Sequence, residues 1–162
     1  MKLSFCILIF CLAVSLTANA QTIIFSDDFE TGNFGASWTA TPGTPNGVVS
    51  INTSIGNPGR GVRMGKTVAG GFVTNTLDLT LNLSAYSNSD VAMTFDIQDR
   101  GDETHSEDGI YFSDNGGGSF EKIFDFNPSI WCDDDYGSFP PFDIDSLAAA
   151  KGLNLTSNFV IR

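Results

Sequence analysis

The sequence predicts an all-β fold, an antiparallel sandwich or barrel with one short helix. Apolar and polar residues alternate with a period of two through several short segments. Turn residues such as those of 42-PGTPNG-47 and 115-NGGG-118 separate these segments, and helical periodicity is almost absent. Alternation of this kind places one face of each strand in a core and the other face in solvent.

Residues 1–20 are predicted to be a signal peptide. Lys2 gives a positive start, residues 5–16 are apolar, and 18-ANA-20 is a small-x-small cleavage pattern. The apolar run is too short for a comfortable membrane span, and no stop-transfer segment follows it. We therefore expect a secreted or cell-surface protein whose mature β-sandwich domain spans residues 21–162.

Strands are predicted in order along the mature chain. The clearest are 76-TLDLTLNLS-84, in which leucines alternate with polar residues, and 91-VAMTFDIQ-98. The last alternation stops at Arg162 without a polar tail. We therefore expect a truncated fold, with a closing strand and further domains of the same chain beyond this residue. The shorter alternations lie at 22–25, 38–41, 48–52, 61–64, 109–113, 120–124 and 157–162.

One helix is predicted, over 145-DSLAAAKG-152. Asp145 or Ser146 can cap its start, its alanines favour helix, and Gly152 can end it. The segment before it, 126-FNPSIWCDDDYGSFPPF-142, is predicted to be a long aromatic loop. Loops of this length are often functional, although these aromatic rings can equally cover a sheet edge.

The composition excludes some functions. Without Lys2 the chain keeps its 19 acidic residues against seven of its eight basic residues. Such a surface repels phosphate backbones and anionic lipids, so we expect binding to neither nucleic acid nor membrane. Only Cys132 remains after residues 1–20 are removed, so no disulfide forms within the mature chain, and we expect this thiol to be buried.

Two segments resemble the MAM and reelin-type jelly-roll modules of extracellular proteins. The segment 26-SDDFETGNFGASWTA-40 is similar to their opening, with an acidic-Phe-Glu strand followed by a tryptophan. The segment 107-EDGIYFSDNGGGSFEKI-123 is similar to a second hallmark, and its 113-SDNGGGSF-120 resembles an Asp-box hairpin with Asn115 in the aspartate position. This replacement weakens the expected loop-locking role of the side chain, although asparagine can serve in a similar turn. The resemblance implies an antiparallel jelly-roll sandwich in which the hairpin is structural.

The same resemblance implies a structural calcium ion. Calcium takes six to eight oxygen ligands, and the acidic residues of 99–108 repel one another with only Arg100 to compensate them. A solvated loop between two strands is the alternative interpretation of this segment. Asp28 and Glu30 match the acids of the family's opening strand. The candidate metal ligands are Asp28, Glu30, Asp102, Glu103, Glu107 and Asp108.

The sequence gives little support for catalysis. His105 is the only imidazole, no Gly-x-Ser-x-Gly motif is present, and the acids of 132-CDDD-135 disfavour a thiolate at Cys132. We therefore expect a non-catalytic extracellular binding or adhesion module, stabilised by calcium, with a glycan or protein ligand. If the ligand is a sugar, aromatic rings of the long loop are expected to stack on it. These rings are Trp131, Tyr136 and Phe139.

Two alternatives stay open. The domain could be a secreted glycoside hydrolase or lyase itself, or it could be the accessory module of a secreted protease or polysaccharide-degrading enzyme. A hydrolase needs two carboxyl groups in one cleft, for which Asp96 and either Glu107 or Asp108 are candidates. The domain could also be a structural spacer of a surface protein.

Overall fold

The computed structural model describes residues 21–100, 105–126 and 135–162. Its strands form antiparallel sheets, which confirms the all-β prediction. The helical elements of this described part are a 3₁₀ turn, η1 (Ser84–Tyr86), and one short helix, α2 (Ile144–Ala150). Its strands are β1 (Trp38–Thr41), β2 (Gly47–Gly56), β3 (Gly59–Lys66), β4 (Thr76–Leu81), β5 (Ala92–Met93), β6 (Asp96–Ile97), β7 (Gly109–Ser113), β8 (Glu121–Asp125), β9 (Gly137–Ser138), β10 (Phe142–Asp143) and β11 (Phe159–Ile161).

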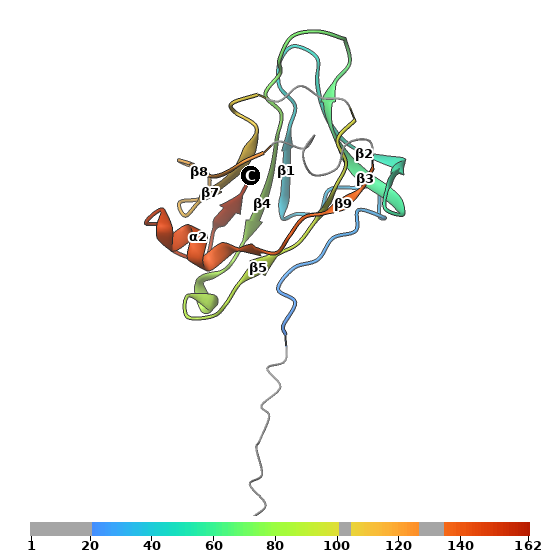
Figure 1. Ribbon diagram of the computed structural model, residues 1–162. Helices are drawn as coiled ribbons and strands as arrows, with labels where there is room; N and C mark the ends of the chain where they lie inside the picture. The colour runs from blue at the N-terminus through green and yellow to red at the C-terminus, as the bar shows by residue number, and fades with distance from the viewer. Residues whose placement is uncertain (1–20, 101–104, 127–134) are drawn as a thin grey trace, which may run out of the picture.

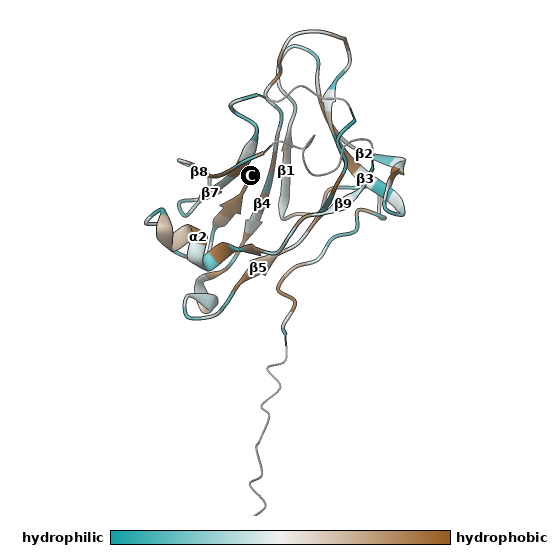
Figure 2. Cartoon of the chain, in the orientation of Figure 1, coloured by the Kyte–Doolittle hydropathy of each residue, from teal (hydrophilic) through white to brown (hydrophobic). Residues whose placement is uncertain are grey.

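The larger layer is a five-stranded antiparallel sheet with the order β1-β4-β11-β7-β8 (Figure 1). Strand β11 is last in the chain but lies in the middle of the sheet. Its Ile161 pairs with Leu79 of β4 on one side and with Phe112 of β7 on the other. Figure 2 shows β11 as one of the hydrophobic segments at the centre of the molecule.

The second layer is a narrow antiparallel ribbon formed by residues 91–97 and 137–144. β5 pairs with β10 and β6 pairs with β9, and the Phe139 amide donates to the Phe95 carbonyl between them. Pro140 and Pro141 lie between the two paired stretches, where a proline cannot donate to the ladder. The two-stranded hairpin β2–β3 flanks this ribbon (Figure 1).

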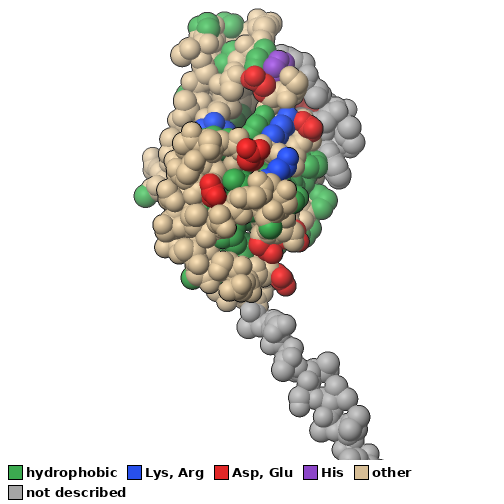
Figure 3. Space-filling view, turned by 90° about the vertical axis from the view of Figure 1, so that its left-hand side faces the viewer, with side chains coloured by type: hydrophobic (Ala, Val, Ile, Leu, Met, Phe, Trp, Pro, Cys, Tyr) green, Lys and Arg blue, Asp and Glu red, His purple; other side chains and the backbone are tan. Residues whose placement is uncertain are grey.

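The outer face of the five-stranded sheet carries charged and aromatic side chains that pair with one another. Arg162 continues β11, makes two hydrogen bonds of 2.7 and 2.9 Å to the Asp78 carboxylate, and stacks 3.7 Å from the Phe120 ring centroid. The hydrogen bonds to Asp78 raise the pKa of the Arg162 guanidinium. Lys122 lies 5.7 Å from the Tyr111 ring centroid. Figure 3 shows basic and acidic side chains interleaved on the side of the molecule that includes β8.

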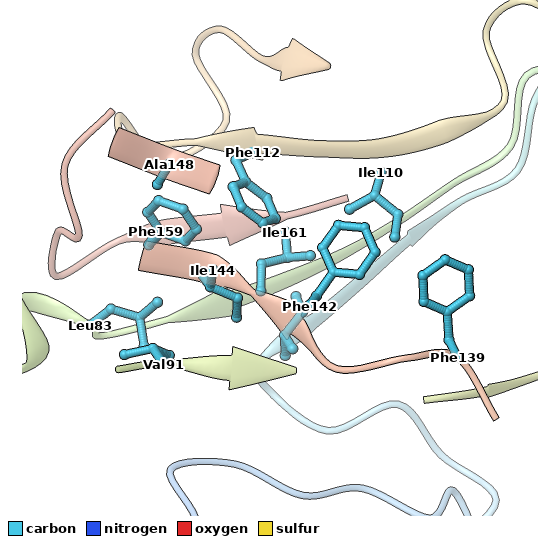
Figure 4. Packing of buried hydrophobic residues seen from close by; sticks show 11 residues of the cluster. Leu83, Val91, Ile110, Phe112, Phe139, Phe142, Ile144, Ala148, Phe159 and Ile161 are labelled. Carbon is cyan, nitrogen blue, oxygen red and sulfur yellow. The ribbon is translucent and has the colours of Figure 1, made fainter. Parts of the chain in front are cut away.

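The hydrophobic core lies between the sheet and the ribbon (Figure 4). Phe112, Phe159 and Leu83 are fully buried in it. At the other end of the core the Phe139 ring stacks on Phe95 at 4.9 Å. Burial of each large apolar side chain contributes roughly 1.5–3 kcal/mol, so this cluster dominates the stability of the fold.

The opening segment differs from its prediction. Residues 22–25 form no strand, so that prediction is wrong, although Phe25 packs against Trp38 with ring centroids 5.8 Å apart. The Asp27 carboxylate accepts hydrogen bonds from the Phe29 amide at 2.8 Å and from the Trp38 indole at 2.9 Å. These bonds fold the chain into a turn in which Phe29 has a φ of 60°. Alternation here reflects packing without a strand partner.

The predicted helix is present with a shifted start. Helix α2 begins at Ile144, and its N-cap is Asp143, whose carboxylate accepts from the Ser146 amide at 3.0 Å. Hydrogen bonds from Ser146 lower the pKa of the Asp143 carboxyl. Gly152 follows the helix with a φ of 73°, as a terminating glycine should.

Candidate functional site

The predicted opening-strand ligands are both hydrogen-bonded to the backbone. The Asp28 carboxylate accepts from the Glu30 amide at 3.1 Å. The Glu30 carboxylate accepts from the Arg60 amide at 2.6 Å, at the start of β3. This second bond fastens the opening segment to the β2–β3 hairpin, so Glu30 has a structural role independent of any ion.

The other described acids, Glu107 and Asp108, lie toward the opposite end of β3. Asp108 shares a small depression with residues 64–66, four to six residues along the strand from Arg60. At about 3.3 Å per residue this is roughly 13–20 Å, which is too far for the two pairs of acids to share one ion. The two remaining candidate ligands, Asp102 and Glu103, lie outside the described residues.

The described residues do not by themselves fit a calcium site. Within 21–100, 105–126 and 135–162, no three or more His, Cys, Asp or Glu side chains are grouped so that they could hold a metal ion. Calcium needs six to eight oxygens. A calcium ion in this domain therefore stays a prediction that depends on Asp102 and Glu103.

The predicted sugar-stacking rings are placed differently from one another. Trp131 lies outside the described residues. Tyr136 is half-buried, and its hydroxyl donates to the Ile55 carbonyl of β2. Phe139 is only 6% exposed and is covered by Phe95, Phe124 and Phe142. Packing, the alternative interpretation of these rings, therefore holds for Phe139, which presents no free face to a ligand.

The structure brings together a different aromatic pair at one end of the molecule. The loop of residues 67–75 joins β3 to β4 and lies opposite the opening segment (Figure 1). Phe72 in this loop is 43% exposed, and its ring stacks on the His105 ring with centroids 3.5 Å apart and planes 16° apart. Figure 3 shows the histidine at the upper end of the visible face, beside hydrophobic atoms. We call Phe72 and His105 the ring pair.

The turn that carries His105 is held by hydrogen bonds. The Asp108 carboxylate accepts from the His105 amide at 2.6 Å, and the His105 carbonyl accepts from the Asp108 amide at 2.9 Å. The Glu107 amide donates to His105 Nδ1 at 3.2 Å, which leaves the proton of the neutral imidazole on Nε2. The Tyr111 hydroxyl donates to the Glu107 carbonyl at 2.8 Å. This turn therefore holds the imidazole under the Phe72 ring.

Two depressions lie on either side of Phe72. The larger, of about 540 Å³ and open to solvent, is lined by residues 41–44, 72–74 and Thr76. The smaller, of about 120 Å³, is lined by residues 64–66, Phe72, Val73, Asn75 and Asp108. Asn75 fixes the loops around them, because its side chain accepts from the Gly43 amide at 3.0 Å and donates to the Gly65 carbonyl at 2.8 Å. The candidate site therefore consists of the ring pair and the two depressions beside it, at the end of the molecule that carries the loop of residues 67–75.

Sequence reasoning missed this site. The segment 68-VAGGFV-73 is apolar but has no strand or helix period, so nothing marked it as exposed. Phe72 and His105 come from loops far apart in sequence, and only the fold brings their rings together. The available signal was a phenylalanine beside two glycines in a turn, a place where a core residue is unusual.

The hairpin that resembles an Asp-box is a locked turn. Asn115 Oδ1 accepts from the Ser113 hydroxyl at 2.8 Å and from the Ser119 amide at 3.0 Å. Its Nδ2 donates to the Ser119 hydroxyl at 2.9 Å. Ser113 is fully buried and also accepts from the Gly117 amide at 2.9 Å. Asparagine therefore serves in this turn, because its amide oxygen accepts hydrogen bonds and its amide nitrogen donates one.

Comparison with known proteins does not extend this description: no family model, curated protein or solved structure matches the chain. Within the part of the chain that the structure describes, no helix has the length and apolar character needed to cross a membrane.

Proposed function

We propose that this chain is a non-catalytic extracellular binding module of the jelly-roll type, whose ligand surface is the loop end around Phe72. One observation carries the proposal. Two large apolar side chains at this end are exposed to solvent and do not belong to the hydrophobic core: Val68 is 52% exposed and Phe72 is 43% exposed. Exposed apolar patches with a polar rim often mark interaction sites.

Two carboxyl groups of the hydrolase alternative, Asp96 and Glu107, are each hydrogen-bonded to a nearby hydroxyl group. Asp96 lies on the exposed side of the ribbon, where its carboxylate accepts from the Ser138 hydroxyl at 2.6 Å. Glu107 lies at the loop end, 3.4 Å from the Thr74 hydroxyl. Each carboxylate therefore has a local structural partner. A glycosidase instead needs two carboxyl groups about 5–9 Å apart across a substrate.

The binding function can be tested on a panel of extracellular glycans and matrix proteins. Residues 21–162 should bind at least one member without releasing products. The double variant Val68→Ser/Phe72→Ser should lose this binding. The matched control Ile23→Ser removes an equally apolar residue, 77% exposed, from the opening segment at the other end, and should bind as wild type. Binding to no member contradicts the proposal, and product release favours the hydrolase alternative.

Calcium stabilisation is the second part of the proposal. It is supported by the family resemblance and by the acidic residues of 99–108. A ligand that binds only the folded state raises the unfolding midpoint in a concentration-dependent way. We expect calcium to raise the midpoint relative to chelator, and the double variant Asp102→Asn/Glu103→Gln to abolish the rise. An unchanged midpoint in wild type contradicts calcium binding and leaves the binding function untouched.

A further inference from the structure

We propose that the ring pair is a platform for a neutral glycan, with threonine hydroxyls of the larger depression as its polar rim. This inference rests on the proposed binding function and names the ligand class and the contact residues. It differs from the prediction based on the long aromatic loop, because it uses neither Trp131, Tyr136 nor Phe139.

The platform is preorganised. His105 stacks on one face of the Phe72 ring at 3.5 Å, and Phe72 as a whole stays 43% exposed. Hydrogen bonds with Glu107 and Asp108 hold His105 in turn. Sugar rings present faces of C–H groups that pack on aromatic rings. A ring that is already immobilised loses little further conformational entropy when a ligand stacks on it.

The rim of the larger depression suits sugar hydroxyls. Each threonine hydroxyl can donate one hydrogen bond and accept others, as sugar hydroxyls do. Thr74 lies next to the Glu107 carboxylate, which adds a strong acceptor at this edge. An apolar peptide segment would cover these groups without pairing them, and unpaired buried polar groups are costly. The hydroxyl-bearing residues of the rim are Thr41, Thr44, Thr74 and Thr76.

Charge selects a neutral ligand over an anionic one. The chain has a net charge of −11, and the residues that line the larger depression include no lysine or arginine. A uronate or sulfated sugar would be repelled by the Glu107 carboxylate without a compensating cation at this depression. A short neutral oligosaccharide fits this charge.

The test is isothermal titration of residues 21–162 with neutral oligosaccharides and with uronate oligosaccharides of equal length. We expect binding of a neutral oligosaccharide only. Phe72→Ala should weaken it about tenfold or more, because the stacking surface is lost. Phe72→Trp should retain it, because a larger ring keeps that surface. Ile23→Ala changes an exposed residue of the opening segment, away from the loop end, so its affinity should stay within about twofold of wild type.

The rim is tested separately with Thr74→Val, which keeps the shape and removes the hydroxyl. We expect affinity for the neutral oligosaccharide to fall about threefold to tenfold, as for loss of one hydrogen bond. Unchanged unfolding midpoints show that each variant is folded. Neutral-glycan binding that survives Phe72→Ala overturns the platform but leaves the binding function standing. Binding of only uronates or only proteins overturns the ligand class, and binding of nothing on either panel overturns both proposals.

Discussion

Two turns of this protein contain the same pair of left-handed glycines but differ in the side chains and contacts around them. The hairpin 113–120 and the loop 67–75 each contain two consecutive glycines with positive φ, 72° and 87° at Gly116 and Gly117, and 80° and 73° at Gly70 and Gly71. A Cβ added to Gly116 would lie 2.6 Å from Asn158 Nδ2. A Cβ added to Gly70 or Gly71 would meet nothing within 4 Å.

The side chains explain the difference. In the hairpin, Ser113, Asn115 and Ser119 satisfy one another and the nearby backbone amides. In the loop, Val68 and Phe72 are held out toward solvent. A turn whose polar groups are paired internally has little left to offer a ligand, whereas a turn that exposes a ring does. The comparison therefore supports a structural role for the first turn and is consistent with the proposed binding role of the second.

The largest expected effect is on the locked hairpin. Asn115→Ala removes three hydrogen bonds at 2.8–3.0 Å, so we expect the free energy of unfolding to fall by about 2 kcal/mol. Urea unfolding followed by fluorescence measures this. Asn115→Asp keeps the acceptors and should cost less. A loss below about 0.5 kcal/mol for the alanine variant would show that the lock contributes nothing to stability.

A pair of glycine variants compares the two turns directly. Gly116→Ala must accept a positive φ and displace Asn158, and should cost about 1–2 kcal/mol. Gly70→Ala meets only the backbone strain, in a loop with space to relax, and should cost less than about 1 kcal/mol. If the two variants lose the same free energy of unfolding in urea, the contrast between a packed hairpin and an open loop is contradicted.

The N-cap of helix α2 is also held by hydrogen bonds to a short side chain, and it is exposed. Its contribution to stability can therefore be measured as a function of pH. Hydrogen bonds from Ser146 hold the folded pKa of the Asp143 carboxyl below its ordinary value of 3.8. The carboxylate therefore stabilises the fold above pH 3.8, and this stabilisation is lost as pH falls through the lower, folded pKa. Asp143→Asn keeps a capping oxygen and does not titrate. Because only the wild type loses a charged cap, the difference in urea midpoint between wild type and this variant should shrink between pH 5 and pH 2.5. A difference that stays constant over this range would contradict the stabilising role of the Asp143 carboxylate.

The smallest expected effect on stability is at the loop. Phe72→Ala removes a ring that is 43% exposed, so the unfolding free energy should change by less than about 0.5 kcal/mol. The same variant should lose glycan affinity. A fall of 2 kcal/mol or more would make Phe72 a core residue and remove the contrast between the two turns.

The sequence predicted the sheet better than the site. Strands 38–41 and 109–113 were predicted with their observed bounds, because alternation records which face is buried. The hairpin around Asn115 was found for a similar reason, since a turn depends on residues near one another in sequence. Residues 22–25 show the limit of the method, because they alternate without a partner to pair with.

The site prediction was wrong where contacts between residues distant in sequence determine which side chains are exposed and which lie together. Composition marked Phe139 as an aromatic loop residue, but only the fold shows that three other phenylalanines cover it. Phe72 was missed, because its partner His105 is brought to it by the packing of two loops that are distant in sequence. Asp28 and Glu107 were grouped because both are acidic, although they lie toward opposite ends of β3.

The central position of β11 has a consequence for biosynthesis. Leu79 and Phe112 emerge from the ribosome long before Ile161, the residue that lies between them in the sheet. A nascent chain therefore carries two half-sheets with an open seam until residues 159–161 have been made. Contacts this distant in sequence slow folding. During synthesis the five-stranded sheet thus stays incomplete until residues 159–161 pair with β4 and β7, and chaperones can hold the chain in this state.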